Sequence, residues 1–286
     1  MPGLKMGNAL FVDMDGKLHI IIVGSYGFGK TISTNILSER KTDMYLQDYF
    51  GFMIAILICM AFSGIASAKV NSTFQKYNGV RSRSGMTGYD TVRRLMDANH
   101  VRGISIGRVS GTLSDHYHPA KAVVNLSEST YGSASVAAVA VAAHEMGHVM
   151  QKQDGYGFYQ LRTALVPVVN IGSFLAMPLV LLGLLLDSIV MSANSELGFH
   201  VAMLGVILYG GSFLFALVTL PVELNASCRA KQMLLRQGIL SQDEIPGAEK
   251  VLSAAAMTYL ASLVTSAVYF LRFLLYVLSI FGRRRR

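Results

Sequence analysis

His144 and His148 lie one helical turn apart in the segment His144-Glu145-Met146-Gly147-His148. The run before them, residues 134–143, is rich in alanine and valine and predicts a helix. On a helix, residues i and i+4 share one face, so the two imidazoles can bind a single zinc ion. Glu145 would then lie beside the ion as a candidate general base. The alternative is a helix that carries two surface histidines.

The composition predicts that this site belongs to a membrane protein. Of the 286 residues, 52% are hydrophobic and only 15% are charged, whereas a soluble domain needs more charge on its surface. Several apolar runs are long enough to cross a bilayer, and the last of them has a possible amphipathic start at residues 251–260. We predict four transmembrane helices, at residues 46–68, 166–187, 199–222 and 251–281.

The net charge and the number of cysteines argue against a nucleic-acid-binding protein and against a protein built on disulfides or a cysteine-rich metal cluster. The net charge of +8 fits lysines and arginines at a membrane surface, and no interleaved basic and aromatic patch indicates a nucleic-acid partner. The two cysteines, Cys59 and Cys228, are too few for a disulfide framework or a cysteine-rich metal cluster.

A catalytic zinc site needs a third protein ligand, and topology narrows the search. If every span crosses the membrane, residues after the first and third spans share one side. Glu223 follows the third span, at the start of a helical segment predicted for residues 223–250, and is our candidate. Its alternative role is that of an interfacial carboxylate at a helix N-terminus. His116 and His118 remain open as a third ligand or as donors to a developing oxyanion.

The region between the first two spans, residues 69–165, must position the histidines. Thr87 is a candidate N-cap for a helix over residues 88–99. Two short strands, Val101–Val109 and Ala122–Leu126, are predicted on either side of the loop at residues 114–119. We expect the second strand, around Asn125, to be the edge that holds an extended substrate, although a hairpin that only covers the helix is the alternative.

A second motif lies near the N-terminus. Residues 18–23 resemble a buried strand, and residues 24–31 fit the phosphate-binding pattern G-x-x-x-x-G-K-T. A nucleotide-binding domain would also need a parallel sheet and a later carboxylate for magnesium. Too little chain separates this motif from the first span for such a domain, so we expect residues 1–43 to be a short extension. Translation from Met44 is a further hypothesis.

From residue 45 onward the chain resembles the YugP-like bacterial membrane-associated neutral zinc metallopeptidases. The resemblance is carried by segments that occur in order along the chain: Phe74–Tyr77, Val80–Gly85, Leu113–Tyr117, Ala142–His148, Leu161–Asn170, Thr219–Ser227 and Val251–Ala256. It implies a mainly α membrane protein that carries a small α+β zincin-like (gluzincin) catalytic domain.

The same resemblance implies roles for individual residues. His144 and His148 would be zinc ligands, with Glu145 as the base. Glu223 aligns with the Glu-x-x-Ala pattern that supplies the third ligand in the related HtpX-like proteases. Those proteases usually carry Asp four residues after that Glu, whereas this chain has Ser227. The supporting role of this position is therefore an open question.

The expected function is zinc-dependent hydrolysis of peptide bonds by an integral protein of the bacterial inner membrane. Substrates would be peptides or membrane proteins, and the sequence does not determine the oligomeric state. The rivals are a non-catalytic protein that uses zinc for structure or partner binding, and a nucleotide-binding membrane protein that depends on Lys30.

The orientation of the site is predicted from charge. Residues 187–196 contain no Lys or Arg, which favours an outside location for this loop and a cytosolic catalytic region. Arg283–Arg286 would then end a four-span chain on the outside, which opposes this orientation.

Overall fold

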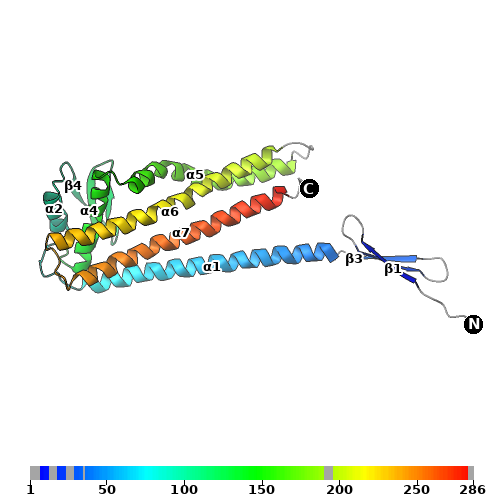
Figure 1. Ribbon diagram of the computed structural model, residues 1–286, viewed down its shortest axis with the longest axis horizontal. Coiled ribbons are helices and arrows are strands. Elements are labelled where there is room, and N and C mark those ends of the chain that lie inside the picture. Colours follow the sequence, from blue (N-terminus) through cyan, green and yellow to red (C-terminus); the bar gives the residue numbers. More distant parts are fainter. Residues whose placement is uncertain (1–6, 13–17, 24–28, 35, 190–195, 283–286) are drawn as a thin grey trace, which may run out of the picture. The chain divides into compact units, whose positions relative to one another are not determined.

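The computed structural model describes residues 7–12, 18–23, 29–34, 36–189 and 196–282. The chain divides into two compact units, residues 1–57 and residues 58–286. Figure 1 labels the four long helices and those shorter elements for which there is room. Residues 190–195, part of the loop without Lys or Arg, and the arginines at 283–286 both entered the orientation prediction, and both lie outside the described residues.

The N-terminal unit contains a three-stranded antiparallel sheet in the order β1-β2-β3, with strands Gly7–Val12, Leu18–Val23 and Gly29–Thr34. The predicted strand at residues 18–23 is confirmed. Lys30 belongs to β3 and lies opposite Ile22 in the antiparallel register. A phosphate-binding loop requires a helix to start at its lysine, so the strand conformation contradicts the nucleotide-binding rival. Residues 24–28 of the motif lie outside the described part.

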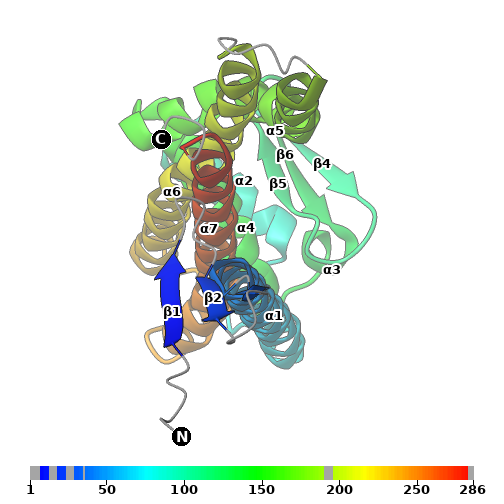
Figure 2. The ribbon, with the colours of Figure 1, turned by 90° about the vertical axis from the view of Figure 1, so that its right-hand side faces the viewer.

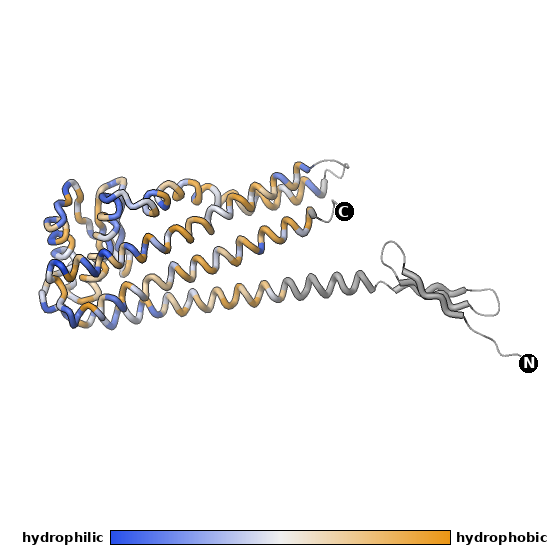
Figure 3. The backbone as a smooth tube through the Cα atoms, viewed as in Figure 1, coloured by the Kyte–Doolittle hydropathy of each residue, from blue (hydrophilic) through white to orange (hydrophobic). Residues whose placement is uncertain are grey.

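Four long helices carry the apolar runs: α1 (Ile36–Asn78), α5 (Gly157–Ile189), α6 (Leu197–Arg236) and α7 (Ile245–Gly282). The stretches that are long and apolar enough to span a membrane are Phe50–Asn78, Gly157–Asp187, Leu197–Arg236 and Ile245–Phe281. The predicted fold class with four membrane helices is therefore confirmed. Hydrophobic residues occur along the length of these helices, and hydrophilic residues gather at one end of the second unit (Figure 3).

All four helices extend beyond the spans predicted from the sequence, and the extensions of α6 and α7 bear on the site. α6 continues through Pro221 to Arg236, and a turn then leads into α7. α7 is one unbroken helix, so the amphipathic start considered for residues 251–260 is not a separate element. Both helices are longer than a bilayer requires, and their extra turns carry residues toward the hydrophilic end.

Glycines allow α5 and α6 to pack closely as an antiparallel pair. A Cβ at Gly205 would lie 2.6 Å from the carbonyl oxygen of Ala176, and one at Gly183 would lie 2.5 Å from that of Gly198. Membrane helices gain no hydrophobic driving force from packing on one another, so close backbone approach at small residues holds them together. This contact fixes the position of α6, which also packs against α4 and α7.

The hydrophilic end contains a small mixed sheet and three short helices. The strands are β4 (Ser105–Val109), β5 (His116–His118) and β6 (Val123–Ser127), in the order β4-β6-β5 (Figure 2). β6 pairs with β4 in parallel and with β5 in antiparallel fashion. The prediction that Asn125 lies on an edge strand is wrong, because β6 is central. The loop at residues 114–119 instead contributes the edge strand β5.

The helices of this end are α2 (Gly88–Ala98), α3 (Glu128–Tyr131) and α4 (Val136–Gln153). Thr87 caps α2 as predicted: its side chain accepts the Asp90 N–H, and the Asp90 carboxylate accepts the Thr87 N–H. The apolar face of α2, which includes Val92 and Leu95, packs into one core with the alanine-rich part of α4. α4 is thereby buried between α2 on one side and the ends of α6 and α7 on the other.

Candidate metal centre

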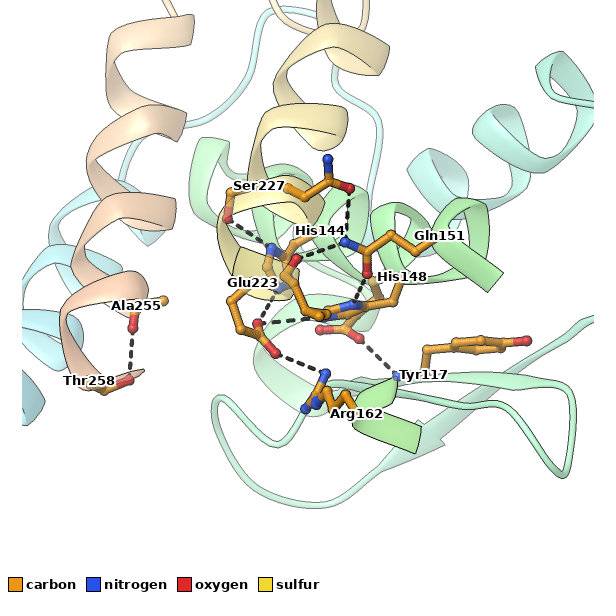
Figure 4. Close-up of polar contacts among 12 residues, drawn as sticks. Tyr117, His144, His148, Gln151, Arg162, Glu223, Ser227, Ala255 and Thr258 are labelled. Atoms are coloured by element: carbon orange, nitrogen blue, oxygen red, sulfur yellow. Dashed lines mark hydrogen bonds and ion pairs between the residues drawn. The ribbon is translucent and has the colours of Figure 1, made fainter. Parts of the chain in front are cut away.

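The histidine motif lies on α4, as the alanine- and valine-rich run predicts. Ser135 caps this helix by accepting the Ala138 N–H. His144 and His148 point from α4 toward α6, where Glu223 projects between them (Figure 4). The Glu223 Oε2 atom lies 3.2 Å from His144 Nε2 and 3.6 Å from His148 Nε2.

The close crossing of α4 and α6 depends on the glycine within the motif. A Cβ at Gly147 would lie 2.5 Å from the carbonyl oxygen of Ala226. Ala226 is the alanine of the Glu-x-x-Ala pattern and is completely buried. The backbones of the two helices therefore touch within one turn of the histidines, and this contact sets the distance between His144 and Glu223.

These three side chains fit zinc by donor type and by spacing. Their ligand atoms, two imidazole nitrogens and a carboxylate oxygen, all lie within 4.8 Å of one another. Tetrahedral zinc with bonds of about 2.1 Å separates its ligand atoms by about 3.4 Å, close to the His–Glu distances here. Two histidines and one glutamate are also a donor set of zinc peptidases that leaves a position for water.

The second nitrogen of each imidazole is held by a polar partner. Gln151 Oε1 lies 3.0 Å from His148 Nδ1, and the Gln151 amide donates to the Val222 carbonyl oxygen at 2.7 Å. A carbonyl can only accept, so the Gln151 oxygen must face His148 and accept its Nδ1–H. The neutral His148 ring is thereby left with a lone pair on Nε2, the nitrogen that faces Glu223.

Ser227 occupies the position where the related proteases usually carry Asp, and it contacts His144. Its hydroxyl lies 3.2 Å from His144 Nδ1, where it can accept a hydrogen bond as a carboxylate would. The contact is neutral, whereas an Asp would add charge. The serine therefore orients the ring without the electrostatic support that a carboxylate gives.

Gln151→Ala is expected to lower zinc affinity by roughly 10- to 100-fold, because His148 loses the partner that sets its tautomer and ring orientation. The measurement is a competition titration against a chromophoric zinc chelator. Gln153→Ala, an exposed position on the same helix, is the matched control. Equal affinities for the two variants would contradict the orienting role.

Glu145 is buried and lines the same pocket as the two histidines. Its Oε2 atom accepts the Tyr117 backbone N–H of the edge strand β5 at 2.8 Å. Burial away from water raises the pKa of Glu145 to about 7, while the neighbouring His144 opposes the shift. A carboxyl group whose pKa lies near neutrality can both take up and release a proton, as a general base must.

Arg162 is a member of the site that the sequence pattern did not single out. Its Nη1 atom lies 3.1 Å from Glu223 Oε1, so the two Glu223 oxygens face different partners. The Glu223 side chain is only 2% exposed, and a buried carboxylate requires such compensation. Arg162 stands at the start of a membrane helix, where a basic residue usually indicates a membrane surface. Only the fold shows that it points inward.

The loop histidines lie apart from the ligand group. His116 Nδ1 is 2.9 Å from the Ser114 carbonyl oxygen, and His116 Nε2 is 3.0 Å from the Asn125 side chain. His118 Nδ1 accepts the Lys121 N–H at 3.3 Å. Neither belongs to the three-residue group that the described residues offer to a metal. His116 still lines the same pocket as Glu145, so its role as a donor to a developing oxyanion stays a prediction.

Comparison with known proteins agrees with the class that this fold and site define, a membrane-bound metallopeptidase. A family model described as "Putative neutral zinc metallopeptidase" matches residues 52–278. The Bacillus subtilis (strain 168) protein named "Putative membrane protease YugP" is 42% identical over 228 residues, which cover 80% of this chain and 97% of the relative. No solved structure matches the chain. The chain belongs to this neutral zinc metallopeptidase family, whose cofactor is zinc.

Proposed function

We propose that this protein is a zinc endopeptidase of the bacterial cell membrane, with His144, His148 and Glu223 as the metal ligands. The observation that carries the proposal is the approach of both imidazole Nε2 atoms to one oxygen of the buried Glu223. A zinc ion held there supplies a Lewis acid and lowers the pKa of a bound water molecule toward 7.

Glu145 performs the proton transfers. Its Oε2 atom is hydrogen-bonded to Tyr117 N–H, so Oε1 is the oxygen that takes the proton of the attacking water. The same oxygen returns the proton to the leaving amine as the C–N bond breaks. Arg162 and Ser227 keep Glu223 and His144 in position through this cycle.

Substrate lies along β5 as an added strand. Tyr117 directs its backbone N–H away from β6 and toward Glu145, so this edge of the sheet faces the catalytic group. Because Glu145 holds the Tyr117 N–H, an extended peptide placed there pairs with the other backbone groups that β5 exposes at this edge. Such backbone hydrogen bonds act on any sequence and hold the scissile bond near Glu145.

The catalytic end faces the cytosol. Among the described residues, basic side chains surround this end of the spans: Lys69, Lys76, Arg162, Arg229 and Lys250. Excess Lys and Arg mark the cytoplasmic side. In a cysteine-free background, Ser110→Cys should react with a membrane-impermeant thiol reagent only after cells are opened. Glu196→Cys, at the far end of α6, should react in intact cells. The reverse pattern would overturn this orientation.

Metal removal tests the proposed function directly. Purified protein in detergent should cleave an unfolded protein substrate, lose cleavage after treatment with a strong zinc chelator, and regain it with one equivalent of zinc per chain. Cleavage that persists after complete removal of zinc would contradict the proposal. With cobalt in place of zinc, the absorption spectrum should change when a hydroxamate inhibitor binds, because one coordination position is open. An unchanged spectrum would favour a closed, structural site.

A further inference from the structure

The pocket at the candidate metal centre continues beyond the catalytic group into the membrane helices. It has a volume of about 460 Å³, and one end is lined by β5, His144, His148 and Glu145. Its other end is lined by apolar side chains from two membrane helices, Val166 and Pro167 of α5 and Phe215 of α6. The polar end provides hydrogen-bonding groups for a peptide backbone, whereas the apolar side chains at the other end provide none.

The apolar end lies at the depth of the hydrocarbon. Phe215 precedes Glu223 by about two helical turns on α6, which is roughly 12 Å along the helix axis. Glu223 follows the apolar run of this helix directly, so Phe215 lies well inside the run. On α5, Val166 lies about one turn beyond Arg162, in the direction of the membrane.

The helices leave this end open at the side. α6 packs against both α5 and α7, and residues of all three helices line the pocket. Val166 is 41% exposed, and the neighbouring Pro167 and Thr163 are exposed as well. These residues belong to a candidate span, so the surface that they expose faces lipid.

We propose that the substrates are membrane-anchored polypeptides that enter this pocket from the bilayer. An apolar residue beside the scissile bond fills the space between Val166, Pro167 and Phe215, while the adjoining backbone pairs with β5 above the membrane surface. The bond that breaks lies where a membrane segment of the substrate ends. Hydrolysis adds one water molecule across that C–N bond. This proposal rests on the proposed peptidase function and names its substrate class.

A matched pair of substrates in proteoliposomes tests the membrane-anchored class. Both carry one cleavable sequence with Leu beside the scissile bond; one continues into a transmembrane helix and the other into a polar linker of equal length. When both substrates are measured in the same vesicles, the kcat/KM for the anchored substrate should be at least tenfold higher than the kcat/KM for the substrate with the polar linker. Equal values for the two substrates would overturn the proposal and leave the peptidase function intact. Cleavage of neither substrate, nor of an unfolded soluble protein, would reject the function itself.

A variant of the pocket tests the contact. Phe215→Ala enlarges the apolar end, so the ratio of cleavage for Trp over Leu beside the scissile bond should rise several-fold. Leu217→Ala, an exposed position on α6 outside the pocket, is the control and should leave the ratio unchanged. A general loss of folding would lower both rates together and leave their ratio unchanged. If an active Phe215→Ala enzyme kept the same ratio of cleavage for Trp over Leu, the proposed contact between Phe215 and the substrate side chain would be overturned.

Discussion

Glu145→Gln is expected to retain zinc and to lose peptide-bond cleavage. The amide is nearly the same size as the carboxylate and can still meet the Tyr117 N–H with its oxygen, so the helix and the ligand group keep their arrangement. The amide cannot take a proton from water at neutral pH, and a positioned general base contributes roughly 10²- to 10⁴-fold to a rate. We therefore expect kcat/KM to fall by at least a hundredfold.

The measurement combines zinc content by elemental analysis with cleavage of an unfolded substrate. Glu128→Gln changes an exposed glutamate outside the pocket and should keep full activity. A fully active Glu145→Gln protein would reject the mechanism, because another group would have to carry the proton. The inactive variant would also keep bound substrate uncleaved, so proteins that copurify with it would reveal the natural substrates.

Gly147→Ala is expected to lower zinc affinity by roughly a hundredfold although it changes no ligand. The added Cβ would lie 2.5 Å from the Ala226 carbonyl oxygen, while a comfortable contact is about 3.5 Å, so α4 and α6 must separate by about 1 Å. Coordination distances tolerate only about 0.2 Å. The separation would withdraw Glu223 from the two histidines.

Gly211→Ala is the matched control, since nothing lies within 4 Å of a Cβ at that position of α6. Alanine also favours a helix over glycine, so this variant should be as stable as the parent. Zinc affinity from chelator competition, compared with thermal unfolding in detergent, separates a local effect from loss of the fold. Normal zinc affinity in Gly147→Ala would show that the helix crossing does not position Glu223.

The elements predicted correctly from sequence are those specified by short-range patterns. Thr87 and Asp90 form a capping box within the first turn of α2, which needs no contact beyond that turn. The four apolar runs are recognisable because every residue that crosses a bilayer meets the same solvent. His144 and His148 share a face of α4 because helix geometry places i and i+4 together.

Tertiary contacts decided which other residues and strands meet the histidine motif. The side chains of Glu223 and Arg162 meet the motif only because Gly147 lets α6 approach α4 and because α5 packs on α6. The sequence predicts a loop where β5 lies, since three residues with two histidines carry no strand signal until β6 pairs with them. The spacing of His144 and His148 by itself determines that both imidazoles lie on one face of the helix. The candidate ligand group, the burial of Glu223 and the pocket beside them depend on residues far apart in the chain, and long-range packing alone brings these together.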